Sequence, residues 1–138
     1  MTTYTITREV DLPSEKLFSI LSDFTRSPSP TIPVEVEKEG DRQANGAGTI
    51  RTITIGMVKV RERLESVNPP NSFSYTILSG APMKDYLGTV EIIPRDSKSE
   101  IRWNVKLTPK IPGAGWLVAM VSKKAINRLI NEMEASNR

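Results

Sequence analysis

The chain has 138 residues, of which 38% are hydrophobic, so it can fill one hydrophobic core and not two. We therefore expect one domain spanning residues 1–138. The sequence has no histidine and no cysteine, which excludes Cys and His metal sites, disulfides, haem ligation, thiol nucleophiles and triads with an imidazole base. We expect no metal and no cofactor, and the chemistry that remains is that of carboxylate, lysine, arginine, tyrosine and hydroxyl groups.

The formal net charge is +3, and the excess of basic residues lies at the C-terminal end. Residues 1–109 carry 14 basic and 14 acidic side chains, whereas residues 110–138 carry five basic and two acidic ones. A basic terminal helix is usually a solvated face, but it also suits an anionic membrane surface. No stretch is long and apolar enough to span a bilayer, and residues 1–10 lack the pattern of a signal peptide, so we expect a cytoplasmic protein.

The N-terminal part predicts a strand followed by a helix. Apolar and polar side chains alternate from Tyr4 to Leu12, which is typical of a strand with one wet face. From Pro13 the apolar spacing becomes helical, and it ends near Phe24. The following residues 27–33 contain three prolines, which predicts a connector with at most a short helical turn.

The rest of the chain predicts strands and then one long helix. Turn-forming residues divide residues 34–108 into six antiparallel strands. After Gly113-Ala114-Gly115 a continuous apolar stripe, which includes Ser122, runs along a segment that extends to about Ala135, and it predicts a long amphipathic helix. The expected order is therefore strand, helix, six strands and long helix.

A hairpin centred on Gly56-Met57 fixes the register of two central strands. A two-residue type II′ loop prefers glycine at its first position, and the alternation of charged residues in the strand after this loop agrees with that register. One face of the hairpin then pairs Ile55 with Val58, Ile53 with Val60, Arg51 with Glu62, and Thr49 with Leu64.

Glu62 is the unusual residue on this apolar face. A lone ionised carboxylate in an apolar interior costs several kcal/mol, so Glu62 must be paired, neutral or directed into a wet cavity. Arg51 is the evident partner. The pair either fixes the strand register or lines a ligand cavity, and Gly88, an inward strand glycine, favours the cavity because it leaves space there.

The same alternation places further residues on the inner face of the sheet. Among them are aromatic side chains with a polar atom that needs a partner when buried, which suits a partly polar pocket. The thirteen candidate ligand-binding residues are Arg51, Ile53, Val60, Glu62, Leu64, Tyr75, Ile77, Tyr86, Gly88, Trp103 and Val105 on the strands, and Trp116 and Met120 at the start of the last helix.

Several segments together resemble the START-like helix-grip (SRPBCC) superfamily, and within it the polyketide cyclase/dehydrase and lipid-transport branch. These segments are Val10–Phe18, Gly46–Arg51, Arg61–Val67 and Trp103 before the long C-terminal helix. The resemblance covers almost the whole chain. It implies an α+β fold with a seven-stranded antiparallel sheet curled around that helix, two short helices after the first strand, and a cavity for a hydrophobic ligand.

The resemblance also implies roles for particular residues. In plant hormone receptors and pollen allergens of this superfamily, Glu62 corresponds to a cavity glutamate and Tyr86 to a cavity tyrosine, and residues 79–84 correspond to a mobile latch. The sequence departs from the hormone receptors in its short loop at Gly56-Met57, in the lack of a lysine between residues 27 and 37, and in Val105, which replaces a second cavity glutamate.

Three functions are compatible with these observations. The first is a non-catalytic protein that binds a small hydrophobic molecule, such as a lipid, an isoprenoid quinone or a polyketide. The second is a cyclase, dehydratase or isomerase without a metal, in which Glu62 or Tyr86 moves a proton. The third is an interaction module that uses the basic helix on RNA, a ribosome or a membrane surface. The interleaved aromatics and dense basic stripe of a nucleic-acid face are missing, so we expect no nucleic-acid partner. The sequence does not specify the oligomeric state.

Overall fold

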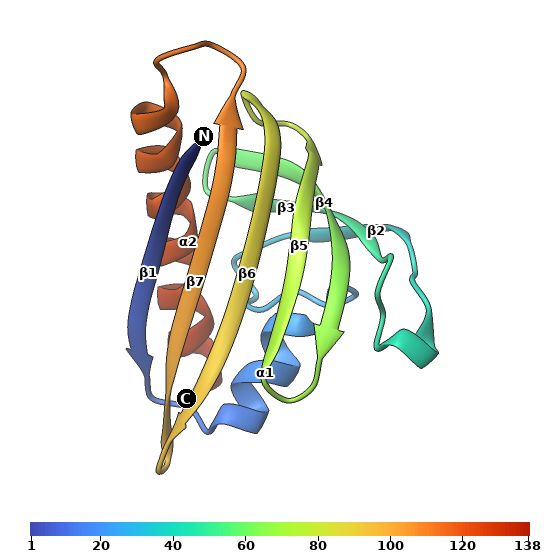
Figure 1. Cartoon of the computed structure of the whole chain (residues 1–138). Helices are drawn as coiled ribbons and strands as arrows, with labels where there is room; N and C mark the ends of the chain where they lie inside the picture. The colour runs from blue at the N-terminus through green and yellow to red at the C-terminus, as the bar shows by residue number, and fades with distance from the viewer.

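The computed structural model describes all 138 residues as a seven-stranded antiparallel sheet that curls around a long C-terminal helix (Figure 1). The strand order is β1-β7-β6-β5-β4-β3-β2. Every pair of neighbouring strands except β1 and β7 is therefore also consecutive in the chain. This confirms the predicted helix-grip α+β fold. The elements are β1 (Thr2–Val10), α1 (Ser14–Ser22), β2 (Val34–Lys38), a 3-10 turn (Arg42–Ala44), β3 (Ile50–Ile55), β4 (Val58–Asn68), β5 (Ser72–Ser79), β6 (Met83–Arg95), β7 (Lys98–Pro109) and α2 (Gly115–Asn137).

The β3–β4 hairpin has the predicted register. Ile55 pairs with Val58, and Arg51 pairs with Glu62. Gly56 has a φ of +61°, a backbone conformation that glycine adopts without steric cost. A shift of the register by one residue would turn the charged face of β4 toward the core. The alternation of charged residues in β4 therefore requires the same pairing that the Gly56-Met57 loop specifies.

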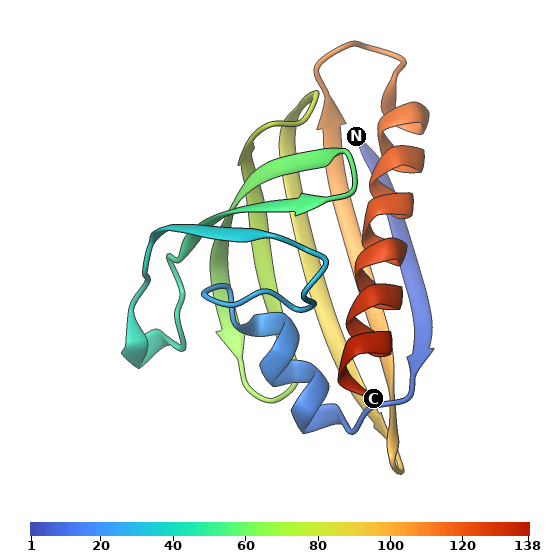
Figure 2. The same ribbon diagram turned by 180° about the vertical axis from the view of Figure 1, so that it is seen from behind.

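The helix α2 packs across the concave face of the sheet (Figure 2). Its predicted apolar stripe is buried from Val118 to Met133, and it forms one connected core of 29 buried residues with the inner faces of the strands and with α1. Neither helix is long and apolar enough to cross a membrane.

The segment between α1 and β2 corrects one expectation. The resemblance implied two short helices after the first strand, but only α1 is helical, and residues 27–33 form turns. Each proline there lacks a backbone N–H and disfavours helix in the residue before it. The Ser27 hydroxyl instead bonds the carbonyls of Ser29 and Ile32, which holds Ile32 in the core.

Candidate functional site: a cavity between the sheet and helix α2

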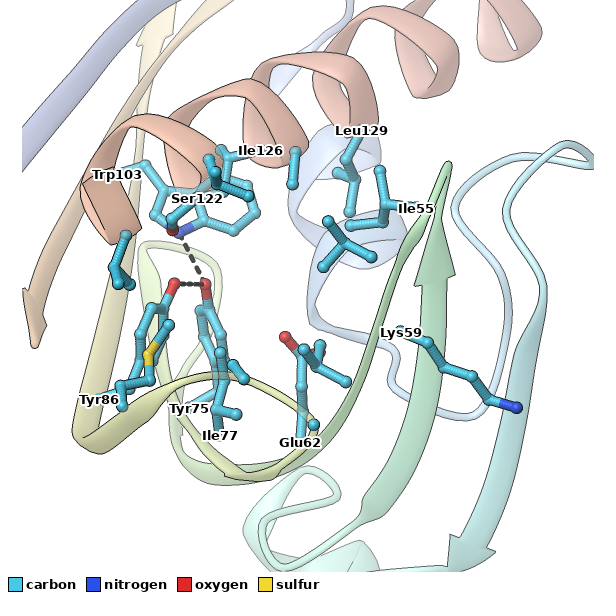
Figure 3. Close-up of a pocket in the computed structure, with 18 of the residues that line it drawn as sticks. Ile55, Lys59, Glu62, Tyr75, Ile77, Tyr86, Trp103, Ser122, Ile126 and Leu129 are labelled. Carbon is cyan, nitrogen blue, oxygen red and sulfur yellow. Dashed lines mark hydrogen bonds between the residues drawn. The ribbon is translucent and has the colours of Figure 1, made fainter. Parts of the chain in front are cut away.

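A cavity of about 460 Å³ lies between the concave face of the sheet and α2. It is lined by 26 residues, 19 of them hydrophobic, and its volume lies in the range that holds one small organic molecule. Figure 3 shows side chains from β3 to β7 and from α2 converging on it. The helix contributes Leu117, Val118, Val121, Ser122, Ala125, Ile126 and Leu129.

The mouth of the cavity lies between two loops and the first half of α2. The tip of the β3–β4 hairpin contributes Met57, and the β5–β6 loop contributes Gly80, Ala81 and Pro82. Lys59 also belongs to the lining, but its side chain extends away from the interior in Figure 3. The side chains at the mouth of the cavity are therefore mostly apolar.

Arg51 and Glu62 form a buried ion pair at one wall of the cavity. The Arg51 Nε donates a hydrogen bond to Glu62 Oε1 at 3.1 Å, and an Arg51 Nη lies 3.0 Å from the same oxygen. The guanidinium also stacks on Phe24, with its Cζ 3.6 Å from the ring centroid. Phe24 follows α1, so the α1–β2 segment covers one face of the cation while Glu62 bonds its N–H groups.

The pair leaves one oxygen of Glu62 free. Oε2 has no hydrogen-bond partner in the protein and is not sealed from the cavity, and the carboxylate points into the cavity from β4 in Figure 3. Burial raises the pKa of the Glu62 carboxyl, and the attraction of Arg51 offsets only part of that rise. Oε2 can therefore accept a hydrogen bond from a ligand, or donate one when the carboxyl is protonated.

Aromatic residues form a second polar group in the cavity. The Trp103 indole N–H donates to the Tyr75 hydroxyl at 3.0 Å, and the Tyr75 and Tyr86 hydroxyls lie 2.7 Å apart. Close to this group, the Ser122 hydroxyl of α2 bonds the Tyr4 hydroxyl of β1. Burial raises the pKa of Tyr4 to about 12 and raises the pKa values of Tyr75 and Tyr86 well above their ordinary range. All three phenols are therefore protonated at neutral pH and act as hydrogen-bonding groups.

Gly88 makes room for Tyr75. A Cβ at Gly88 would lie 2.3 Å from Tyr75 Cε1 and 2.4 Å from Cζ, far inside van der Waals contact. We expected this glycine to leave space for a ligand, and that expectation is wrong: the ring of Tyr75 fills the space. Gly88 therefore shapes the cavity indirectly, by letting the Tyr75 hydroxyl reach Trp103 and Tyr86.

Comparison with known proteins agrees with this architecture. The sequence model of the family described as "Polyketide cyclase / dehydrase and lipid transport" matches residues 1–136. The chain belongs to this family. No curated protein matches the chain by sequence.

Solved structures share the fold of this polyketide cyclase/dehydrase family member. Ara h 8.0201 is 19% identical, with 97% of each chain covered and a TM-score of 0.72. A START superfamily protein from Mycobacterium smegmatis is 15% identical, with 96% of this chain and 94% of that chain covered and a TM-score of 0.74. The di-domain ARO/CYC BexL from the BE-7585A biosynthetic pathway is 14% identical, with 99% of this chain and 46% of that chain covered and a TM-score of 0.75. The helix-grip fold is common to all three.

Seven of the thirteen predicted ligand-binding residues line the cavity of this family member. They are Arg51, Val60, Glu62, Tyr75, Ile77, Tyr86 and Trp103. Four others, Ile53, Leu64, Gly88 and Val105, lie outside the lining. Ile53, Leu64 and Val105 are fully buried core side chains, so the inner face of the sheet is longer than the cavity that it bounds.

Trp116 and Met120 do not reach the cavity, which corrects the prediction for the start of α2. Their side chains are 69% and 42% exposed, and they border a shallow depression beside β1. Six of the first seven residues of this helix are apolar, so the sequence does not show which of them face inward. The structure places Leu117 and Val121 at the cavity mouth instead.

The predictions missed two residues that shape the site. The sequence pattern assigns Phe24 only to the end of the first helix, although its ring stacks against the Arg51 guanidinium. Ser122 was included in the apolar stripe of α2 without a role. It is the one hydroxyl in that stripe, and a lone hydroxyl at an inward position is a signal that could have identified it.

Proposed function

We infer that the protein binds one small, largely apolar molecule in the cavity, with the polar end of that molecule held by the protein's own polar groups. The observation that carries this inference is the cavity of about 460 Å³ with apolar walls and two separate polar groups. Candidate ligands are a lipid, an isoprenoid quinone or a polyketide-like molecule. Buried apolar area supplies affinity, and a few polar atoms select orientation.

The polar atoms favour a ligand with a hydroxyl or carbonyl group. Glu62 Oε2 has no partner in the protein and can accept a hydrogen bond from a ligand hydroxyl. The Tyr86 hydroxyl, which shares a bond with Tyr75, can donate to a ligand carbonyl. Arg51 already balances the charge of Glu62. A second full charge on the ligand would need a counterion within the cavity, so a neutral polar group fits this site best.

An enzymatic function is the alternative, and one observation favours it. Burial raises the pKa of the Glu62 carboxyl, and its Oε2 has no protein partner, as a general acid or base requires. A cyclase or dehydratase would use the cavity to fold a reactive chain, with Glu62 or Tyr86 moving a proton. If Glu62→Gln kept full turnover of an identified substrate, a catalytic role for Glu62 would be wrong.

Native mass spectrometry of protein purified from its own host tests the binding function. The expected result is a 1:1 complex with a non-covalent hydrophobic molecule. Ala125→Phe should abolish the complex, because Ala125 lies on the cavity wall of α2. Ala135→Phe is the matched control, since Ala135 is exposed near the end of the same helix.

Two results would contradict the proposal. One is wild-type protein that always carries no ligand. The other is equal ligand occupancy in Ala125→Phe and Ala135→Phe. Titration with the fluorescent probe 1-anilinonaphthalene-8-sulfonate supplies a second readout, and thermal unfolding of both variants checks that they remain folded.

A further inference from the structure

Exposed apolar side chains gather around the mouth of the cavity. The chain has nine exposed large hydrophobic residues, and six of them lie on the β3–β4 tip, the β7–α2 connector and the first two turns of α2. Met57 is fully exposed and Ile111 is 67% exposed. We call these six residues the apolar rim: Met57, Ile111, Trp116, Leu117, Met120 and Val121.

The rim residues are neighbours in space although they come from separate segments. Met57, Leu117 and Val121 line the same cavity mouth. Trp116 and Met120 share the adjoining depression beside β1. The β7–α2 connector, which carries Ile111, is joined to the β5–β6 loop by a backbone hydrogen bond from Lys110 to Pro82 at 3.0 Å.

Five exposed lysines surround the apolar rim without ion-pair partners. They are Lys59, Lys84, Lys110, Lys123 and Lys124, and none lies within 4.0 Å of a carboxylate. Lys59 lines the cavity mouth, and Lys84 and Lys124 border the depressions that contain Trp116. In residues 56–60, 79–86 and 108–124, which form this end of the molecule, Asp85 is the only acidic residue.

The opposite end of the molecule has a different character. The two acidic residues of α2, Glu132 and Glu134, lie in its last turns, near the C-terminus and away from the β7–α2 connector (Figures 1 and 2). At this end Lys98 pairs with Glu9 and Arg95 pairs with Glu100, whereas Lys16 and Arg138 have no carboxylate partner. The three segments at the rim end carry five lysines and one acidic residue, and the rest of the chain carries 14 basic and 15 acidic residues. The excess of positive charge is therefore concentrated at the end that carries the apolar rim.

We propose that this end of the protein docks on the surface of an anionic lipid bilayer. Exposed apolar side chains enter the boundary between headgroups and acyl chains, and lysines beside them reach the lipid phosphates. A protein partner fits less well, because protein interfaces are depleted in lysine and enriched in arginine, whereas the free cations around the rim are all lysines. The docking surface does not depend on which molecule occupies the cavity.

Vesicle flotation with the full chain tests the proposal. The probes are vesicles of phosphatidylcholine alone and vesicles of phosphatidylcholine with phosphatidylglycerol at a ratio of about 7:3, because surface attraction scales with the anionic lipid. The protein should float with the anionic vesicles and much less with the neutral ones. Added salt should weaken the binding.

The two tryptophans give a second readout. Trp116 is exposed, whereas Trp103 is buried and bonded to Tyr75, so only Trp116 changes environment on docking. Its emission should shift to shorter wavelength with anionic vesicles. Trp116→Phe should remove this shift but retain flotation, because phenylalanine keeps the side chain apolar.

Charge variants separate docking from general electrostatic attraction. Lys84→Glu with Lys110→Glu should reduce flotation at least tenfold. The control is Lys38→Glu with Arg138→Glu, which makes the same change in net charge at exposed residues outside the rim and should have a much smaller effect. Ile111→Ser with Trp116→Ser should also reduce flotation, and far-UV circular dichroism should show that each variant is folded.

Three outcomes would overturn the proposal. The first is a lack of binding to anionic vesicles at low salt. The second is an equal loss of flotation in the rim and control charge variants. The third is a wild-type dimer that Ile111→Ser with Trp116→Ser converts to a monomer while neither form binds vesicles, since the rim would then be an interface between two copies of the chain.

Discussion

Gly88→Ala tests whether Tyr75 occupies the space that the glycine leaves. The new Cβ would lie 2.3 Å from Tyr75 Cε1, 2.4 Å from Cζ and 2.7 Å from the hydroxyl oxygen. The ring has little freedom to move, because the rings of Phe24, Tyr86 and Trp103 lie with centroids 5.6–6.1 Å away. The variant must therefore displace the ring and strain the hydrogen bonds of its hydroxyl.

The expected loss of stability follows from two contributions. Overpacking a close-packed core costs about 1–3 kcal/mol, and weakening the bonds of Tyr75 with Trp103 and Tyr86 adds about 1 kcal/mol. We expect Gly88→Ala to lower the free energy of unfolding by about 2–4 kcal/mol. Urea unfolding followed by circular dichroism measures this loss.

A double-mutant cycle identifies the cause of the loss. In a Tyr75→Ala background the clash is absent, and Gly88→Ala should then cost less than about 1 kcal/mol, because alanine also reduces the entropy of the unfolded chain. An equal cost of Gly88→Ala in both backgrounds would refute the reasoning. So would a Gly88→Ala single variant as stable as the wild type.

Three further predictions concern the buried polar groups. Tyr75→Phe leaves the Trp103 N–H without its acceptor. The free energy of unfolding, measured by urea denaturation, should fall by about 1–3 kcal/mol. An unchanged value would contradict the hydrogen bond between Trp103 and Tyr75. All three tyrosines of the chain have a raised pKa, so absorbance near 295 nm should show almost no tyrosinate in the folded protein at pH 10. The free energy of unfolding should fall as the pH rises above about 10, because the unfolded chain then loses these protons more readily than the folded protein. Titration of the phenols near their ordinary pKa before unfolding would contradict their burial. The raised pKa of Glu62 means that the native state binds the Glu62 proton more tightly than the unfolded chain does. Wild-type protein should therefore gain stability relative to Glu62→Gln as the pH falls from 7 toward 5. The opposite trend in urea unfolding would show that the attraction of Arg51 outweighs the effect of burial on the Glu62 pKa.

Local sequence patterns were sufficient to predict the sheet. Alternation in β4 and the Gly56-Met57 loop independently specify one register, so Arg51 and Glu62 could be paired before the structure was known. The loop needs a positive φ, and a shift of one residue would bury charge. Two independent constraints on the same strands made this prediction precise.

Other features depend on packing between distant segments. Phe24 stacks on Arg51 across more than twenty residues of chain, and no periodicity encodes that contact. The rotation of α2 about its axis is also ambiguous at its start, where apolar residues surround the helix and nothing distinguishes Trp116 from Leu117. Gly88 was misread for a similar reason, since a missing side chain does not say which neighbour fills the space.

The central claim is that the space between the sheet and α2 holds a small hydrophobic molecule. A crystal structure of the protein purified from its own host tests this most directly. The account predicts electron density for one molecule bounded by apolar residues of α2, with a polar atom within hydrogen-bond distance of Glu62 Oε2 or the Tyr86 hydroxyl. A solid core, with α2 packed directly on the sheet and no cavity beside Glu62, would contradict it.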